Sequence, residues 1–355
     1  MSVKELSICS IINTSLQKVK LSDNMASKML CKICGGKVRR IYKDLYDNRH
    51  GYPGRFSIEE CQNCGFKHTM PQIPARKLTF LYTNFYPKRD ANIDKTIRLS
   101  KKIPTKWQIF LNGLGTTCHY QTKRDDTVLD IGCGNCLSLL EITNLGGKPW
   151  GIDPDKNSEK AAKKLHLKFH LGTIHTCRFP KKHFDLITAS QVLEHENNPV
   201  KFLTDCKKFL KPGGKIILSF PNTDTFFRKI WGQHWLHWHV PYHLNHFSRK
   251  SINILARRSN LKIVNIKTIT PNVWTILQIS SFINQTKEGV RNPMWDEPKN
   301  NKTLKDKSKI NFIHSSFRII ETLFIVNRIF DFLGWGESYV VEVQKKEYGP
   351  CYYPS

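Results

Sequence analysis

The chain has 355 residues, and 56 Lys and Arg against 29 Asp and Glu give it a formal net charge of +27 at pH 7. This length allows one large domain beside a smaller one, and no apolar run reaches the roughly 18–20 residues that a membrane-spanning helix needs. Eleven cysteines without a secretory signal in the polar stretch Met1–Leu30 argue against a disulfide framework, so we expect thiols, metal ligands and a cytoplasmic protein.

The charge favours an anionic partner, which would be nucleic acid, a phosphorylated or nucleotide-linked substrate, or a membrane surface. A compositional bias is the alternative, because Lys, Asn and Ile are abundant and lysines scattered over solvated faces need no partner.

Two cysteine motifs follow residues 1–28, which lack periodicity and which we interpret as a flexible tail. The motifs are Cys31-Lys-Ile-Cys34-Gly and Cys61-Gln-Asn-Cys64-Gly. Each directs two sulfurs at one ion, and the pair is typical of a zinc ribbon with four cysteine ligands. Four ordinary buried thiols, the alternative, would not require a glycine after each pair. Such a closed site makes the zinc structural, with no open position for catalysis.

The remainder of the ribbon unit, over 29–88, contains a predicted strand at Phe56–Glu60 and an aromatic, helical segment at Leu78–Tyr86. The aromatic segment would pack the ribbon on the next domain or line the substrate entrance. The charged, proline-containing stretch Lys88–Lys106 forms a connection or a first helix before the sheet begins.

A strand, a tight turn and a helix are predicted from Thr127-Val-Leu-Asp-Ile-Gly-Cys-Gly-Asn-Cys136 and the amphipathic pattern after it. This is the first unit of a nucleotide-binding α/β sheet. A phosphate-binding fingerprint would read Gly-x-Gly-x-x-Gly, whereas here Asp130 stands two residues before the first glycine. An acid there suits a ligand with an ammonium group and no phosphate, and Asp153 closes the next apolar run, where it can accept ribose hydroxyls.

Strand patterns at about 127–131, 149–153, 185–190 and 215–220 alternate with helical patterns, which predicts a doubly wound, mainly parallel sheet. Ile263–Thr268 and Tyr339–Val343 would finish it as an antiparallel pair at one edge. We therefore expect an α/β core over 89–269, an insertion over 270–334, a final strand within 335–347 and a tail over 348–355.

Further motifs follow in register: Phe184-Asp-Leu-Ile, Val192-Leu-Glu-His195 and Leu210-Lys-Pro-Gly-Gly. With the first loop and the acid at 153, they resemble the class I S-adenosylmethionine-dependent methyltransferases over roughly Lys106–Ser259, and the resemblance returns near Tyr339. It implies a Rossmann-like fold and S-adenosylmethionine as cofactor. Cys136 departs from the family, which often has a third glycine there, but a small side chain is what close helix–strand packing needs.

The resemblance also assigns the cofactor residues. Asp130, Gly132 and Gly134 would approach the methionine part and Asp153 the ribose. Thr173 and Ile174 would lie along the adenine, and Gln191 beneath the sulfonium. Ubiquinone-type O-methyltransferases can hold a divalent metal with a related segment, E-V-x-E-H; here Gln191 replaces its first acid, so we expect no catalytic metal beside Glu194 and His195.

A cluster of histidines and tryptophans over His234–His246 marks the acceptor side. It resembles a segment found after the fifth strand in relatives of the ubiquinone-type O-methyltransferases and in enzymes of sugar and polysaccharide biosynthesis. Imidazole titrates near neutrality, so we predict His239 or His243 as general base, with His195 next. The alternative is that His243 and His246 hold the loop through backbone hydrogen bonds. The predicted walls of the acceptor pocket are Trp235, Trp238 and Tyr242.

The insertion has a polar middle, Lys287–Lys309, which should be a mobile loop, and a final amphipathic helix, Phe317–Leu333, with a wide apolar face. The helix would cover the active site as part of the core. Contact with a membrane surface and a dimer face are the alternatives.

Methyl transfer to a small-molecule acceptor is the predicted function, the acceptor being a sugar, a glycan precursor or a lipid-linked intermediate. The alternative is an RNA methyltransferase whose ribbon and basic surface bind phosphates. Against it, the sequence has no Asn/Asp-Pro-Pro-Tyr motif for flipped bases and no compact arginine-rich tract. A non-catalytic binding module is disfavoured because every cofactor motif is present.

Overall fold

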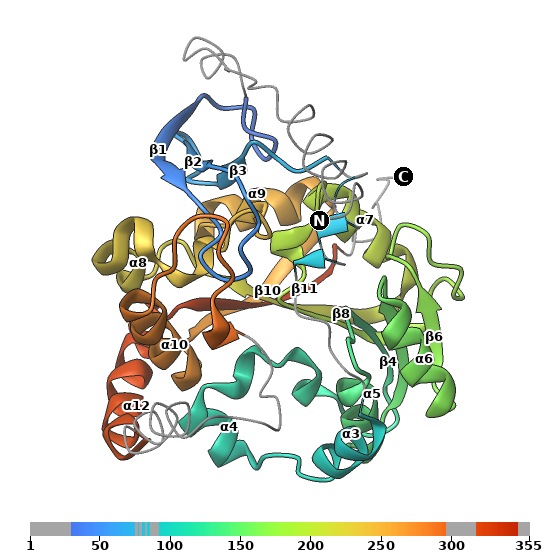
Figure 1. Cartoon of the computed structure of the whole chain (residues 1–355). Coiled ribbons are helices and arrows are strands. Elements are labelled where there is room, and N and C mark those ends of the chain that lie inside the picture. Colours follow the sequence, from blue (N-terminus) through green and yellow to red (C-terminus); the bar gives the residue numbers. More distant parts are fainter. Residues whose placement is uncertain are drawn as a thin grey trace, which may run out of the picture.

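A seven-stranded sheet forms the centre of the molecule (Figure 1). The computed structural model describes residues 30–74, the single positions 77, 80, 81, 84 and 85, residues 92–295 and residues 317–346, the last with side chains from 325 on. In spatial order the strands are β10 (Leu261–Ile269), β11 (Ser338–Lys345), β8 (Leu210–Pro221), β7 (Phe184–Ser190), β4 (Thr127–Ile131), β5 (Lys148–Asp153) and β6 (Lys168–Leu171).

The strands from β8 to β6 pair in parallel, whereas β11 runs antiparallel to both β8 and β10. The expected doubly wound α/β sheet with an antiparallel pair at one edge is therefore confirmed. In such a sheet, ligands bind in the crevice outside the carboxyl ends of the parallel strands.

Helices cover both faces of the sheet because its strands are apolar on both sides. Val128 and its neighbours face α5 (Leu137–Asn144) and α6 (Lys156–Lys164). Leu129, the next residue, belongs to the core under α7 (Pro199–Phe209) and α9 (Arg249–Arg258). The remaining helices of the core are α3 (Ile93–Ser100), α4 (Lys106–Asn112), α8 (Phe226–Trp231) and the short 3₁₀ helices η2 (Leu114–Thr116), η3 (Cys118–Gln121), η4 (Leu193–His195), η5 (Gly232–His234) and η6 (Leu236–Trp238).

A second, four-stranded sheet joins the N-terminal unit to the core. Its order is β1 (Val38–Leu45), β2 (Phe56–Cys61), β3 (Lys67–Met70) and β9 (Asn245–His246). The last strand comes from the histidine-rich segment, and Lys67 pairs with His246 across the junction. The N-terminal unit and the histidine segment are thus parts of one hydrogen-bonded sheet, a connection that the sequence does not indicate.

A third core cluster lies under this small sheet. Phe56 and Ile58 of β2 pack there with Trp235, Trp238 and Tyr242. Leu81, from the aromatic segment predicted at 78–86, is also buried in this cluster. The other described residues of that segment are Phe80 and Asn84, both exposed, and Phe85. Leu81 agrees with the packing role expected for the segment.

The insertion contains α10 (Asn272–Ile283), η7 (Pro293–Trp295) and α12 (Phe317–Phe332). The expected final helix exists, but its orientation differs from the expectation of a core helix: Ile329 and Phe332 are 54% and 91% exposed, whereas Asn327 is buried. The Asn327 amide donates to Asn272 Oδ1 at 3.1 Å, so polar contacts attach α12 to α10. Because those contacts face inward, Ile329 and Phe332 are left outside, whereas Phe330 packs against Phe226 and Trp335.

Several expectations fall on residues outside the described ranges: the tails at 1–28 and 348–355 and, from residue 296 on, the loop expected over 287–309. Among the helices that the structure describes, none is long and apolar enough to cross a bilayer.

Candidate active site and four-cysteine cluster

The loop between β4 and α5 has the backbone that its glycines predict. Gly132 has φ 77° and Gly134 φ 55°, in the left-handed region. A Cβ at Gly132 would meet Val192 Cγ2 at 2.8 Å, so the first position also requires glycine for space. Cys136 stands where the family often has a third glycine and adopts φ 65°. It is fully buried, which fits the small side chain expected there.

Asp130 lies beneath this loop. One carboxylate oxygen accepts from Ser138 Oγ at 2.5 Å and the other from Thr188 Oγ1 at 2.6 Å. The carboxylate therefore fixes α5 and β7 around the loop. Burial raises its pKa, and the two hydroxyl bonds oppose that rise. Contact with the methionine part of the cofactor stays a prediction.

Asp153, at the end of β5, connects two backbone turns. Its carboxylate accepts from Gly134 N–H at 2.9 Å and from Asp155 N–H at 2.8 Å. The carboxylate can accept more than these two hydrogen bonds, and the predicted ribose hydroxyls would use that capacity.

Replacing Asp153 with alanine should weaken S-adenosylmethionine binding by roughly 1.5–3 kcal/mol, the range for hydrogen bonds to a charged group. The loss removes the ribose acceptor and also releases the Gly134 amide. Isothermal titration calorimetry measures it, and Asp153→Asn, which keeps one acceptor oxygen, should lose less. Unchanged affinity in the alanine variant would remove Asp153 from the site.

The remaining predicted cofactor residues lie at the ends of β6 and β7. Thr173 is partly exposed, and its N–H donates to Thr176 Oγ1 at 3.2 Å, while Ile174 is buried in the core. The Gln191 side chain donates to Ser219 Oγ at 3.4 Å and Ser338 Oγ at 3.3 Å, so it points along the sheet toward β8 and β11. Their contacts with the cofactor stay predictions.

The three histidines predicted as candidate bases come together from two segments. His195 ends η4, just after β7, and its ring centroid lies 4.9 Å from that of His243. The ring of His239 is also 4.9 Å from His243. His239 itself has φ 33°, a backbone conformation uncommon outside glycine and often found at functional sites.

Burial keeps these imidazoles neutral. It lowers the pKa of His195 to about 4, and it lowers the pKa values of His239 and His243 well below the ordinary value. His243 Nδ1 lies 2.8 Å from the His237 carbonyl and His195 Nδ1 2.9 Å from that of Tyr242. Since a carbonyl only accepts, each Nδ1 carries the proton and each Nε2 keeps its lone pair. A neutral imidazole with an unprotonated ring nitrogen is the form that a general base requires.

His50 joins this cluster from the loop between β1 and β2, and sequence reasoning missed it. Its ring lies 5.5 Å from His239 and 5.3 Å from Tyr242. Asp47 shapes the loop by accepting from the backbone N–H groups of Arg49, His50 and Tyr52. Nothing in the spacer between the cysteine motifs indicated this, since its contact partners lie almost two hundred residues away.

Glu194 is fully buried beside the histidines, and burial raises its pKa to about 8. Neither carboxylate oxygen has a hydrogen-bond partner in the described part of the chain. Ligand atoms of Glu194, His195 and His243 lie within 4.8 Å of one another, a set able to hold a divalent ion. The expectation of no catalytic metal considered only the segment 191–195 and did not include His243. It stays a prediction, which metal analysis tests.

The predicted walls of the acceptor pocket are almost completely buried. Trp235 Nε1 donates to Glu337 Oε1 at 3.4 Å, and Trp238 Nε1 donates to the Gly232 carbonyl at 2.9 Å. Tyr242 stacks on His239 with ring centroids 4.8 Å apart. Tyr242 thus lies directly against His239, and it shares the core under the small sheet with both tryptophans. Their contact with an acceptor stays a prediction.

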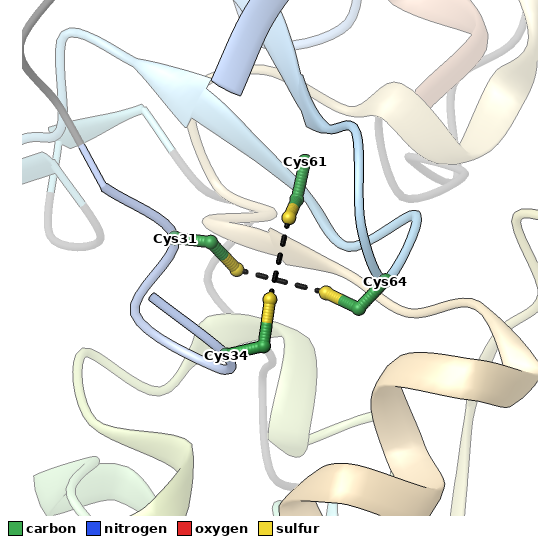
Figure 2. A group of neighbouring side chains, drawn as sticks. All are labelled: Cys31, Cys34, Cys61 and Cys64. Carbon is green, nitrogen blue, oxygen red and sulfur yellow. Dashed lines mark hydrogen bonds between the residues drawn. The ribbon is translucent and has the colours of Figure 1, made fainter. Parts of the chain in front are cut away.

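Figure 2 shows the sulfur atoms of Cys31, Cys34, Cys61 and Cys64 pointing toward one another. All four lie within 4.8 Å of one another, and two of the separations are 3.4 and 3.7 Å. Tetrahedral zinc with bonds of about 2.3 Å separates its sulfurs by about 3.8 Å. Gly35 and Gly65, which follow the two motifs, have φ 75° and 68°, as the predicted turns require. The four thiols therefore form a cluster with the dimensions of a zinc site.

A family model described as a methyltransferase domain matches residues 68–266, more than half of the chain. The chain belongs to this methyltransferase family. This family agrees with the class I, S-adenosylmethionine-dependent type that the sheet and loop motifs resemble.

Ubiquinone biosynthesis O-methyltransferases are among its relatives. Those of Bradyrhizobium sp. (strain ORS 278) and Bradyrhizobium diazoefficiens are 36% identical over 100 residues and 39% identical over 101 residues. Each alignment covers 27% of this chain and 40% of the relative, so the chain spans less than half of the relatives it matches.

Similar solved structures include geranyl diphosphate C-methyltransferase from Streptomyces coelicolor, at 14% identity and a TM-score of 0.43, covering 73% of this chain and 86% of the other. A second is an S-adenosylmethionine-dependent methyltransferase from Mesorhizobium loti, at 12% identity and a TM-score of 0.39, covering 66% and 98%.

Proposed function

We propose that this methyltransferase acts on a hydroxyl group of a small-molecule acceptor, a sugar, a glycan precursor or a lipid-linked intermediate, and that a buried histidine removes the proton. The observation that carries the proposal is the cluster of neutral imidazoles next to the end of β7, where the parallel strands open toward the cofactor loop. Bound S-adenosylmethionine supplies an electrophilic methyl group.

The protein itself has to position the acceptor and remove one proton. S-adenosylmethionine, held by the predicted cofactor residues, would supply the methyl group that the acceptor oxygen takes, and an imidazole Nε2 would accept the hydroxyl proton. His243 is central because its ring contacts both His195 and His239, and the His237 carbonyl fixes its tautomer. His239 remains the other candidate base.

The test is transfer of a labelled methyl group to a panel of acceptors: nucleotide sugars, lipid-linked sugars, phenols and RNA, with the products identified by mass spectrometry. Methylation at oxygen of a sugar, phenol or lipid-linked acceptor supports the proposal. Methylation of RNA alone would contradict it.

Salt dependence separates the two acceptor classes independently. With a phosphorylated small-molecule acceptor, raising NaCl from about 50 to 200 mM should change KM by less than about tenfold and leave kcat nearly constant, because few charges are involved. An RNA substrate held through many phosphates would lose roughly 10³–10⁵ in affinity over the same range. Initial rates across a salt series measure the difference.

We further propose that Cys31, Cys34, Cys61 and Cys64 hold one structural zinc and that the enzyme works in the cytoplasm, where thiols stay reduced. The sulfur separations and the left-handed glycines support the zinc. The proposed units are the ribbon and linker over 29–88, the catalytic core over 89–269 with its last strand in 335–347, and the insertion over 270–334.

A further inference from the structure

Helices α4 and α12 lie next to one another (Figure 1). Their described parts carry exposed apolar side chains. Trp107 is 65% exposed, and its ring stacks on that of Phe110, with centroids 5.7 Å apart. Between the two helices lies a groove of about 380 Å³ with an almost entirely apolar lining. Arg328 and Leu333 also line it; the other lining residues, Trp107, Phe110, Leu111, Ile325, Ile329 and Phe332, are called the α4–α12 face below.

Polar contacts behind the face hold it in this orientation. A capping box formed by Thr105 and Gln108 starts α4. At its other end, Asn272 Nδ2 donates to the Leu111 carbonyl at 2.9 Å, and Arg328 Nη1 donates to the Phe110 carbonyl at 2.7 Å. Arg328 also pairs with Asp331 at 2.9 Å. The buried side of the junction is thus occupied by hydrogen bonds, so the rings cannot turn inward without breaking them.

The chain that leads into this face is positively charged. Its lysines are Lys101, Lys102 and Lys106, and the sequence from residue 95 to residue 124 contains no Asp or Glu. All three lysines are exposed and lie within the six residues before Trp107. Exposed aromatic side chains with lysines beside them match the boundary of an anionic bilayer, where rings enter the headgroup region and lysines meet lipid phosphates.

We propose that the α4–α12 face docks on the surface of an anionic membrane. A second copy of the chain suits the face less well, because a symmetric dimer through it would place its lysines opposite one another. The inference does not depend on the identity of the methyl acceptor, and its test uses vesicles without acceptor or cofactor.

Sedimentation of the full chain with vesicles of phosphatidylcholine, with and without about a third phosphatidylglycerol, tests this. Binding should require the anionic lipid. The double variant Trp107→Ser/Phe332→Ser and the double variant Lys101→Glu/Lys102→Glu should each lower the partition coefficient at least about tenfold. Both change only exposed side chains, so thermal unfolding should be unaltered.

Matched controls lie on the opposite edge of the sheet. Leu171→Ser, on β6, removes an exposed apolar side chain, and Lys160→Glu/Lys164→Glu, on α6, makes the same charge change as the lysine variant. Both should bind vesicles as the wild type does. Equal loss in the controls, or no binding by the wild type, would overturn the proposal. Analytical ultracentrifugation showing a dimer that the Trp107/Phe332 variant abolishes, without vesicle binding, would overturn it in favour of a second copy.

Discussion

Replacing His243 with alanine should lower turnover at least about a hundredfold, the usual contribution of a general base, while S-adenosylmethionine affinity stays within about twofold. The imidazole is buried, neutral and tautomer-fixed, so its Nε2 lone pair is available at neutral pH. It belongs to the predicted acceptor segment, whereas Asp153, the predicted ribose ligand, ends β5. Single-turnover rates with the identified acceptor and calorimetry with the cofactor measure the two quantities.

A structural role for His243 must be separated from a chemical one. His243→Asn keeps a side-chain N–H that can donate to the His237 carbonyl but has no basic nitrogen. If His243 is the base, the asparagine variant should fold normally and remain as slow as the alanine variant. His234→Ala, from the same segment but exposed, is the matched control and should keep nearly full turnover.

The pH profile gives an independent readout. Because burial lowers the pKa of His243 well below its ordinary value, and that of its neighbour His195 to about 4, the base form persists into acid. Turnover in wild type should therefore stay constant from pH 8 down to about 6 and fall only at lower pH, where the imidazole gains a proton. Near-normal turnover in alanine variants of both His243 and His239 would place the base elsewhere.

A large loss of zinc and of thermal stability is expected when the cysteine cluster is changed. Freshly purified protein should contain about one zinc per chain, and Cys31→Ser should lower that content at least about tenfold, since a structural site needs all four ligands. The melting temperature should fall by about 10 °C, which corresponds to roughly 3–5 kcal/mol for a domain of this size. Inductively coupled plasma mass spectrometry and calorimetric scans measure the two losses.

Loss of zinc should also impair catalysis. The small sheet continues from β3 into β9, and Phe56 and Ile58 share a core with Trp235 and Trp238. The loop that carries His50 extends from the same sheet, so a disordered ribbon would release one side of the histidine cluster. Cys177→Ser, a partly buried cysteine outside the cluster, is the matched control and should retain zinc, stability and turnover.

The same metal analysis checks the Glu194 site. One zinc per chain in wild type, with none lost in His243→Ala, agrees with the prediction of no catalytic metal. A second divalent ion that disappears in His243→Ala would contradict it and assign that ion to the cluster of Glu194, His195 and His243. Protein free of zinc in its native state would contradict the ribbon proposal itself.

Local sequence patterns predicted much of this structure. The order of apolar runs predicted the sheet with its antiparallel edge, because strand period, turn glycines and short connections are recorded within a few dozen residues. Gly35 and Gly65 predicted the turns of the two cysteine motifs in the same way, since the conformation of each turn depends only on the backbone next to the motif. The positive φ of Gly132 and Gly134 could also be predicted, because a tight turn between a strand and a helix requires it.

Long-range packing decided the rest. His50 contacts His239, and β9 extends the small sheet. Both contacts join segments almost two hundred residues apart, and no local sequence pattern predicts contacts over such a separation. The wide apolar stripe of α12 predicted a core helix, yet buried bonds from Asn327 and Arg328 turn Ile329 and Phe332 toward solvent. The sequence alone determined which elements form and where the cofactor loop lies. Only the tertiary structure decided which histidines meet and which apolar face stays exposed, because both depend on the sum of distant contacts that no single segment encodes.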